Sequence, residues 1–385
     1  MAPLFVLGLL EFVRQALVVS IIPLYGQLEA GFSLGTIGTA IFLLYLVDNL
    51  CRLPAGWLTD RLGGKVMISG GIGISGVGLF LMFVHWNSTF FMLGAGLFGL
   101  GISPVWPAVI SEITAKEPMH QIGEALSKVF IAWLVGAGAG IVVMNYFFGH
   151  SYALSFAILG GVLVLALALT ISGELPRVDT KGILPTPAFL KELGRELVAL
   201  KILYPGMFVQ TMSLGIMTPI IAIYARTVLG FSTQQFAYFV IIGGAFTVLL
   251  LVPSGKIADR LGVKRPLIAG FSLATIGLVL LPLQKLALNA LVLGALIGIA
   301  YALILPAWNG LIARAISPEK MGTMWAVFMT IEGMGMAVGA YVGGQVWDRF
   351  GPQAPFWVCA FILGTMVVFY SSGNIDKFVG KFAQK

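Results

Sequence analysis

Charge is scarce in this 385-residue chain, in which Asp, Glu, Lys and Arg together make up only 10% of the residues. A soluble domain of ordinary composition carries about 25% charged residues. Hydrophobic residues instead reach 58%, and the mean hydropathy is +0.98. This balance excludes an ordinary soluble protein and predicts an integral membrane protein.

Cysteine and histidine are also sparse. Cys51 and Cys359 fall in separate apolar stretches, and the three histidines lie far apart in the sequence. We therefore expect no disulfide framework, no metal site and no cofactor. Neither a nucleophile–base set nor clustered metal ligands stand at a membrane face, so we expect no enzymatic activity. A removable signal peptide is not expected either, because the first apolar stretch has no basic leader and no small-residue cleavage site.

Long apolar runs are abundant. Stretches of about 20 residues favour helices, because a membrane barrel shows alternating segments of about ten residues. We predict an all-α membrane protein with twelve transmembrane helices. Their expected ranges are 3–25, 33–56, 66–84, 90–113, 122–146, 152–173, 203–228, 234–256, 266–283, 287–313, 322–347 and 354–373.

The placement of lysine and arginine predicts the orientation. With the N-terminus inside, the inner loops and tail hold seventeen of these residues, and the outer loops hold three, Arg226, Lys285 and Arg349. Positive residues concentrate on the cytoplasmic side. We therefore expect a multi-pass protein of the cell membrane with both termini cytoplasmic. Its net charge of +7 then reflects topology and contact with membrane lipid, and nucleic-acid binding is not expected.

The longest connection divides the chain into six spans and six. We predict an N-terminal six-helix bundle at 1–173, a cytoplasmic linker at 174–202, a C-terminal six-helix bundle at 203–373 and a cytoplasmic tail at 374–385. The second part of the linker is amphipathic. It is interpreted either as a helix lying at the inner membrane surface or as a solvated linker with some helicity.

The two halves repeat each other. The run GWLTDRLGGK at Gly56–Lys65 recurs as GKIADRLGVK at Gly255–Lys264, an offset of 199. The run SPVW at Ser103–Trp106 recurs as LPAW at Leu305–Trp308, an offset of 202. Two unrelated motifs with nearly one offset indicate duplication, and hence two pseudo-symmetric bundles. Parallel repeats of this kind are a transporter design with the site near mid-membrane.

Three charges stand inside the first two spans, Glu11, Arg14 and Asp48. A charge near the bilayer centre costs about 2.5–3.5 kcal/mol and usually faces the bundle interior. Glu11 and Arg14 are three residues apart and can pair on one helix face. At about 1.5 Å per residue, both acids lie roughly 12 Å from the same membrane face. Burial favours a neutral carboxyl and Arg14 favours a carboxylate, so these residues are candidates for proton coupling. A permanent ion pair that fixes helix packing is the alternative.

The second half also contains isolated polar residues. Glu332 is either a second protonatable site or an acid hydrogen-bonded to a neighbour, and Gln210 is interpreted as a residue that bridges helices. Glycines in the fifth and eleventh spans, Gly136 and Gly335 among them, serve either close packing or a hinge.

The pattern G-x-L-x-D-R-x-G-x-K resembles the signature loop of the major facilitator superfamily, and the resemblance extends over the chain through its twelve spans and its 6+6 division. It implies the major facilitator fold and a gating role for this loop. The residues concerned are Gly56, Asp60, Arg61, Lys65, Asp259 and Arg260. A tight basic turn that only fixes topology is the alternative.

A second resemblance rests on the runs LLEFVR, YLVD, GISPVWP, AWLVG, LYPG, LPAWN and WAVF. They are similar to the lipoteichoic-acid glycolipid flippases of Gram-positive bacteria. The resemblance implies export of a diglucosyl-diacylglycerol lipid anchor to the outer leaflet by proton-coupled antiport. It implies proton coupling and headgroup contact by Glu11, Arg14 and Asp48, and it places Trp106 and Trp133 at a central cavity.

The expected substrate contacts divide by polarity. The first half offers polar and aromatic groups suited to a sugar headgroup: Glu11, Arg14, Gln15, Asp48, Asn49, Trp106 and Trp133. The second half offers apolar groups suited to acyl chains: Phe208, Trp308, Trp325 and Phe328. Packing alone is the alternative for the aromatic residues. The expected partners are a glycolipid and protons, and the expected state is a monomer. A proton-coupled antiporter of small amphiphilic compounds or drugs is the alternative function.

Overall fold

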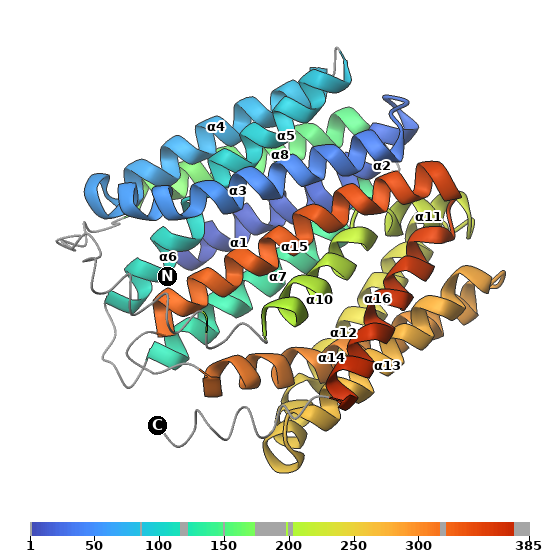
Figure 1. Cartoon of the computed structure of the whole chain (residues 1–385). Helices are drawn as coiled ribbons and strands as arrows, with labels where there is room; N and C mark the ends of the chain where they lie inside the picture. Colours follow the sequence, from blue (N-terminus) through green and yellow to red (C-terminus); the bar gives the residue numbers. More distant parts are fainter. Residues whose placement is uncertain are drawn as a thin grey trace. The chain divides into compact units, whose positions relative to one another are not determined.

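A computed structural model of the chain describes residues 2–84, 87–115, 122–148, 151–173, 198, 203–315 and 321–372 (Figure 1). Within these ranges, side chains are not described at 60, 114–115, 122–127, 313–315 and 321–326. The amphipathic segment predicted in the linker, residue 198 apart, and the predicted cytoplasmic tail lie outside the described residues.

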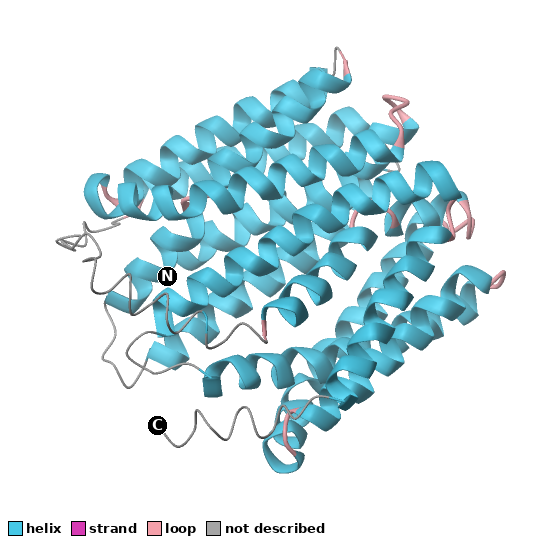
Figure 2. Cartoon of the chain, in the orientation of Figure 1, coloured by secondary structure: helices cyan, strands magenta, loops and turns pink. Residues whose placement is uncertain are grey.

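Every regular element in these ranges is a helix, and no strand occurs among the described residues (Figure 2). Twelve helical stretches in this part of the chain are long and apolar enough to cross a membrane. The prediction of an all-α, twelve-span membrane protein is therefore confirmed. The longest of the spans, Thr233–Leu261, buries only Phe236, Ser254 and Ala258, as expected for a helix with most of its surface on the outside of a bundle.

Close packing divides the chain into two compact units. Unit 1 contains residues 1–189 with 340–345, and unit 2 contains residues 190–339 with 346–385. The helices of unit 1 are α1 (Ala2–Gln15), the π-helix η1 (Ala16–Ile21), α2 (Ile22–Leu28), α3 (Leu34–Leu62), α4 (Gly64–Val84), α5 (Ser88–Ile102), α6 (Val105–Ala115), α7 (Ile122–Phe148) and α8 (Tyr152–Ser172). In this unit α1 packs along α7 and α8, and α5 packs between α3 and α4.

Unit 2 is built in the same way. Its helices are α10 (Tyr204–Met217), α11 (Ile221–Thr227), α12 (Thr233–Leu261), α13 (Lys264–Leu280), the 3₁₀ turn η3 (Leu281–Leu283), α14 (Ala287–Ala315), α15 (Met321–Phe350, shared at 340–345 with unit 1) and α16 (Ala354–Ser372). Here α14 packs against α12 and α13, and α16 packs against α10 and α13.

The repeat seen in the sequence is also a repeat of helix boundaries. Helices α3 and α12 are each 29 residues long and begin after a serine whose hydroxyl accepts a hydrogen bond from the backbone, Ser33 and Ser232. Each ends at a glycine with positive φ, Gly63 at 90° and Gly262 at 79°. Only glycine adopts this conformation without strain. All these positions correspond at the offset of 199 residues, so both copies of the motif start and stop their helices by the same means.

A pair of small residues brings the first and fifth spans of unit 1 into backbone contact. A Cβ atom added at Gly136 of α7 would fall on the carbonyl oxygen of Gly8 in α1. In unit 2, a Cβ atom at Gly335 of α15 would meet the hydroxyl of Thr211 and the carbonyl of Phe208 in α10. The two glycines are again 199 residues apart. Their surroundings favour close packing over a hinge as the role of these glycines.

Candidate functional site

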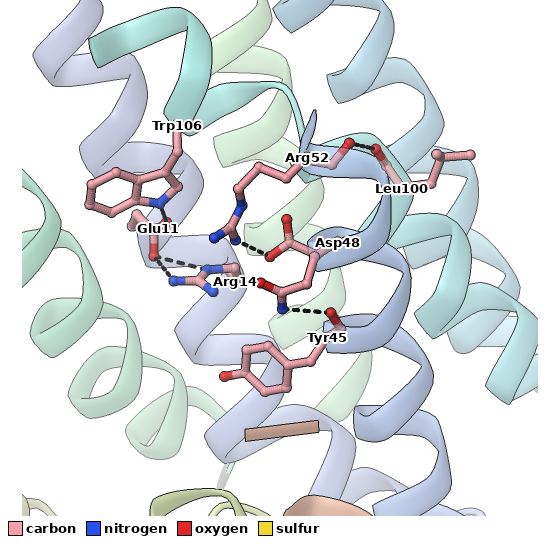
Figure 3. A network of polar contacts seen from close by, with 9 residues as sticks. Glu11, Arg14, Tyr45, Asp48, Arg52, Leu100 and Trp106 are labelled. Atoms are coloured by element: carbon pink, nitrogen blue, oxygen red, sulfur yellow. Dashed lines mark hydrogen bonds and ion pairs between the residues drawn. The ribbon is translucent and has the colours of Figure 1, made fainter. Parts of the chain in front are cut away.

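Glu11 is enclosed between a guanidinium and an indole in the interior of unit 1 (Figure 3). Arg14 donates through Nε and Nη2 to Oε2 of Glu11 at 3.0 and 2.7 Å. Trp106 donates through Nε1 to Oε1 at 2.7 Å. The side chain of Glu11 is 0% exposed. Both carboxylate oxygens therefore accept from donors, which is the arrangement of an ionised carboxylate.

Asp48 forms a second ion pair beside the first. Arg52 Nη2 donates to Asp48 Oδ2 at 2.8 Å, one helical turn along α3. Arg14 lies within electrostatic range of Asp48 and of Tyr45, and Figure 3 shows these side chains facing one another. The two acids thus lie together, as their spacing in the sequence predicted. Two carboxylates and two guanidiniums make a cluster with no net charge.

Asn49 completes the polar surface of α3. Its amide nitrogen donates to the carbonyl of Tyr45 at 2.7 Å, whereas its Oδ1 is buried without a hydrogen-bond partner. Nε of Arg52 is likewise buried without a partner. An unsatisfied buried polar atom costs about 1–3 kcal/mol. These two atoms are therefore the places in the described cluster where a further polar ligand gains most.

An irregular helical segment follows directly after the charges of the first span. Directly after Arg14 and Gln15, the α-helix gives way to the π-helix η1. Single-turn π segments are frequent at functional sites. Ser20 in η1 accepts a hydrogen bond from Asn145 of α7 at 3.0 Å, which ties the irregular segment to its neighbour. The contact of Gly136 with Gly8 fixes α1 against the same helix.

A break between two helices positions the indole. The fourth span is interrupted at Ser103 and Pro104, and the Ser103 hydroxyl donates to the carbonyl of Leu100 at 2.8 Å (Figure 3). Helix α6 starts after the break and carries Trp106, whose ring lies 6.5 Å from that of Trp133 and 6.1 Å from that of Phe130. Trp106 is buried, and Trp133 is half-buried.

Gln15, the remaining polar residue predicted in the first span, is half-buried at the junction between α1 and η1.

The sequence analysis named most of the residues of this cluster. It missed Tyr45, which is 5% exposed and faces Arg14. The spacing of Tyr45 and Asp48, three residues on one helix face, is a signal that identifies it. Arg52, the partner of Asp48, is a further member of the cluster.

The aromatic residues predicted to contact acyl chains differ from one another in their burial. Trp308 and Phe328 are each 1% exposed in the interior of unit 2, whereas Phe208 is half-buried. The Trp308 ring lies 6.4 Å from that of Tyr370, and its Nε1 donates to Oε1 of Glu332 at 3.2 Å. In this conformation neither buried ring is open to a ligand, and their contact with substrate stays a prediction. The side chain of Trp325 lies outside the described residues.

The repeated loops carry exposed charges. Arg61 stacks over the Trp57 ring at 3.8 Å from its centroid, a cation–π contact. Lys65 donates to the carbonyl of Gly173 at 3.4 Å. Asp259 and Arg260 are exposed at the end of α12, and Gly56 is half-buried on α3. The side chain of Asp60 lies outside the described residues. The gating role of these six residues stays a prediction.

Twelve membrane-length helices with paired charges buried inside one unit define a polytopic membrane protein of the transporter type. The family model described as Major Facilitator Superfamily matches residues 4–245 and 203–374. The chain belongs to the major facilitator superfamily, as the signature loop predicted.

Relatives within the superfamily match over nearly the whole chain. The proton-coupled antiporter flippase LtaA of Staphylococcus saprophyticus is 27% identical over 372 residues, which cover 95% of this chain and 92% of the relative. The protein of the same name from Staphylococcus aureus is 26% identical over 377 residues, which cover 96% and 93%. The chain is thus similar to the flippases that its interior motifs resemble.

Solved structures match the fold. The nucleoside transporter NupG is 16% identical, with a TM-score of 0.74 over 96% of this chain and 98% of that chain. A D-xylose-proton symporter is also 16% identical, with a TM-score of 0.76 over 96% of each chain. These two proteins share the fold with this chain, and their substrates carry no argument for it.

Proposed function

We propose that this protein is a proton-coupled flippase that moves a diglucosyl-diacylglycerol lipid anchor for lipoteichoic acid synthesis from the inner to the outer leaflet by alternating access. The observation that carries the proposal is the buried cluster of Glu11, Arg14, Asp48 and Trp106 in unit 1 (Figure 3). The similarity to proton-coupled antiporter flippases supports the same conclusion.

The charge balance of the cluster favours a neutral headgroup. Glu11 and Asp48 are each paired with an arginine, so the cluster presents hydrogen-bonding groups without a net negative charge. A sugar needs donors, acceptors and a flat apolar surface, and the guanidiniums, Asn49 and the tryptophans supply these. An organic cation would instead require an acid without its own counter-ion, and neither acid of this cluster is such a group. A glycolipid headgroup therefore fits this cluster better than a cationic drug does.

Proton coupling follows from competition for Glu11. A proton on Glu11 removes the charge that holds Arg14, because a neutral carboxyl binds a guanidinium less strongly. Arg14 is then free to turn toward Asp48, away from the headgroup position that the Glu11–Arg14 pair forms. When Glu11 loses its proton, the pair forms again and the headgroup can bind. The proton and the headgroup thus exclude each other at this pair, as antiport requires.

The test is reconstitution of the full chain in vesicles with a fluorescent diglucosyl lipid and a proton gradient. We expect lipid movement to collapse the gradient, and Glu11→Gln to abolish lipid-dependent proton movement. The exposed acid Glu29, changed to Gln, is the matched control. Proton movement that responds to cationic amphiphiles and not to the glycolipid would identify the drug antiporter instead. Unchanged coupling in Glu11→Gln would exclude Glu11 as the coupling residue.

We further propose that the protein carries out no covalent chemistry, works as a monomer and has both termini in the cytoplasm. The support for the orientation is the excess of lysine and arginine in the loops assigned to the inner side. A reporter that fluoresces only in the cytoplasm, fused after Lys385, is expected to be active. A reporter that is active only outside the cytoplasm is expected to be inactive at the same position. The opposite result for the two reporters would mean that the proposed orientation is wrong.

A further inference from the structure

Unit 2 contains a carboxylate that the proposed mechanism does not use. Glu332 of α15 receives a hydrogen bond from Trp308 Nε1 of α14 at 3.2 Å and bonds the side chain of Gln210 in α10. Tyr301 of α14 lies within electrostatic range of it. Glu332 is half-buried inside the span Val327–Phe350. Three helices of unit 2 therefore meet at one acid.

The described groups that face Glu332 are neutral. They are Gln210 from α10, and Trp308 and Tyr301 from α14. Among the described side chains, no lysine, arginine or histidine lies within ion-pair distance of Glu332. Burying a carboxylate without a cation is costly, and binding a proton removes that cost. Glu332 therefore differs from Glu11 and Asp48, each of which has its own guanidinium.

Gln210 is a partner for either form of the acid. A primary amide donates through its nitrogen and accepts through its oxygen, whereas a guanidinium only donates. The amide nitrogen suits the carboxylate, and after a turn of the amide its oxygen suits the hydroxyl of the protonated acid. Trp308 donates to Oε1 of Glu332, and this bond suits both forms of the acid. A proton can therefore bind and leave without stranding a buried polar group.

Glu332 is not a copy of Glu11 by duplication. It stands three residues before Gly335, as Trp133 stands three residues before Gly136, and the two glycines correspond at the offset of 199. In unit 1 the acid comes from the first span, and in unit 2 it comes from the eleventh. The indole at Trp106 and Trp308 is the part that both units share.

We propose that Glu332 is a second proton-binding site, at which Trp308 and Gln210 hold the carboxyl group in both protonation states. The carboxylate takes up one proton to give the carboxylic acid, and no other bond changes. Proton uptake removes a buried charge where α10, α14 and α15 meet. That this proton takes part in transport rests on the function proposed above; that Glu332 binds it does not.

Infrared difference spectroscopy of the purified full chain between acidic and alkaline pH tests proton binding directly. We expect a carboxyl C=O band of a poorly hydrated acid that is present in the native protein, in Glu29→Gln and in Glu11→Gln, and that is lost in Glu332→Gln. The Gln side chain keeps an acceptor for the Trp308 indole, so this variant preserves the packing. An identical band in Glu332→Gln would overturn the proposal.

Transport in vesicles then tests coupling. In Glu332→Gln we expect fewer protons per lipid moved and a changed pH profile of transport. If Glu332 had only a structural role, its replacement by Gln would change neither quantity. If the native protein couples lipid to protons and Glu332→Gln does so with the same ratio and pH profile, the coupling role of Glu332 fails and the proposed function stands. If the native protein shows no coupling, the proposed function fails, and the infrared band still decides whether Glu332 binds a proton.

Discussion

In each unit an indole donates to a carboxylate inside a span, buried in unit 1 and half-buried in unit 2, and the electrostatic surroundings of the two carboxylates differ. In unit 1, Trp106 donates to Glu11 at 2.7 Å and Arg14 satisfies the other oxygen. In unit 2, Trp308 donates to Glu332 at 3.2 Å, and the remaining partner is the amide of Gln210. The first carboxylate is paired with a cation. The second is held by groups that tolerate either charge state.

The difference shows which features a duplicated fold retains. The serine caps, the positive-φ glycines and the close-packed Gly136 and Gly335 persist at one offset. These features satisfy backbone geometry, which both copies share. The charges buried inside the spans do not persist, because each is tolerated in a membrane span only with its own local partners. Chemistry thus diverged on a conserved scaffold.

Removal of Arg14 is expected to have the largest effect. Arg14→Ala leaves Glu11 buried without its cation, which destabilises the fold by about 3–5 kcal/mol and abolishes proton-coupled transport. The measurement is the unfolding midpoint in mild detergent as a denaturing detergent is added. Arg61→Ala, at an exposed arginine that stacks on Trp57, is the control and should shift the free energy of unfolding by less than about 0.5 kcal/mol.

The double variant Glu11→Gln with Arg14→Met sharpens this result. It removes both charges, so most of the lost stability should return while transport stays absent. If the single and double variants are equally unstable, the ion pair is not the source of the loss.

Loss of the indole donors compares the two units directly. Trp106→Phe and Trp308→Phe remove the same side-chain volume, so they differ in the hydrogen bond that is lost. We expect the loss of the bond to a charged group in Trp106→Phe to cost about 1.5–3 kcal/mol, and the loss of the bond in Trp308→Phe to cost about 0.5–1.5 kcal/mol. The order follows from the charge on the acceptor and from the 2.7 and 3.2 Å distances. Equal costs in the same unfolding assay would mean that Glu332 is as firmly ionised as Glu11.

The glycine contact predicts a smaller and more local effect. Gly136→Ala places a methyl group against the Gly8 carbonyl and is expected to cost about 1–3 kcal/mol through overpacking. Gly138→Ala on the same helix meets nothing within 4 Å and should be neutral or slightly stabilising, because alanine favours a helix. Gly335→Ala should resemble Gly136→Ala in unit 2. A cost at Gly138 equal to that at Gly136 would point to helix flexibility and away from packing.

Sequence reasoning succeeded where one helix or one loop contains the whole signal. Twelve apolar spans follow from composition and length, and the pairing of Glu11 with Arg14 follows from a spacing of three residues. The family follows from the signature loop that begins at Gly56. None of these inferences requires knowledge of how one helix is rotated against another.

Hydrogen-bond partners that lie on different helices could not be predicted from the sequence. Trp106 meets Glu11 across 95 residues, and Trp308 meets Glu332 across 24. Both contacts depend on helix rotation within a bundle, which apolar periodicity leaves undefined when all faces are apolar. The same limit applies to Trp308 and Phe328, which are buried in unit 2 and whose contact with substrate stays a prediction. A large aromatic residue in a span satisfies packing and binding equally well.

The helix caps should give the smallest effects and the closest match between the units. The hydroxyls of Ser33 and Ser232 each accept from a backbone N–H three residues on at 3.2 Å. Ser33→Ala and Ser232→Ala are therefore each expected to cost about 1 kcal/mol in the unfolding assay. The units differ in the side chain three residues after the serine, which is Gln235 in unit 2 and Thr36 in unit 1. Gln235 Oε1 accepts a second hydrogen bond from the Ser232 N–H at 2.8 Å. Gln235→Ala should cost about a further 0.5 kcal/mol through the loss of this capping box, and Thr36→Ala in unit 1 should cost less. If Gln235→Ala is silent, both caps rest on the serine alone, and the two units are equivalent at their helix starts as well as in their packing.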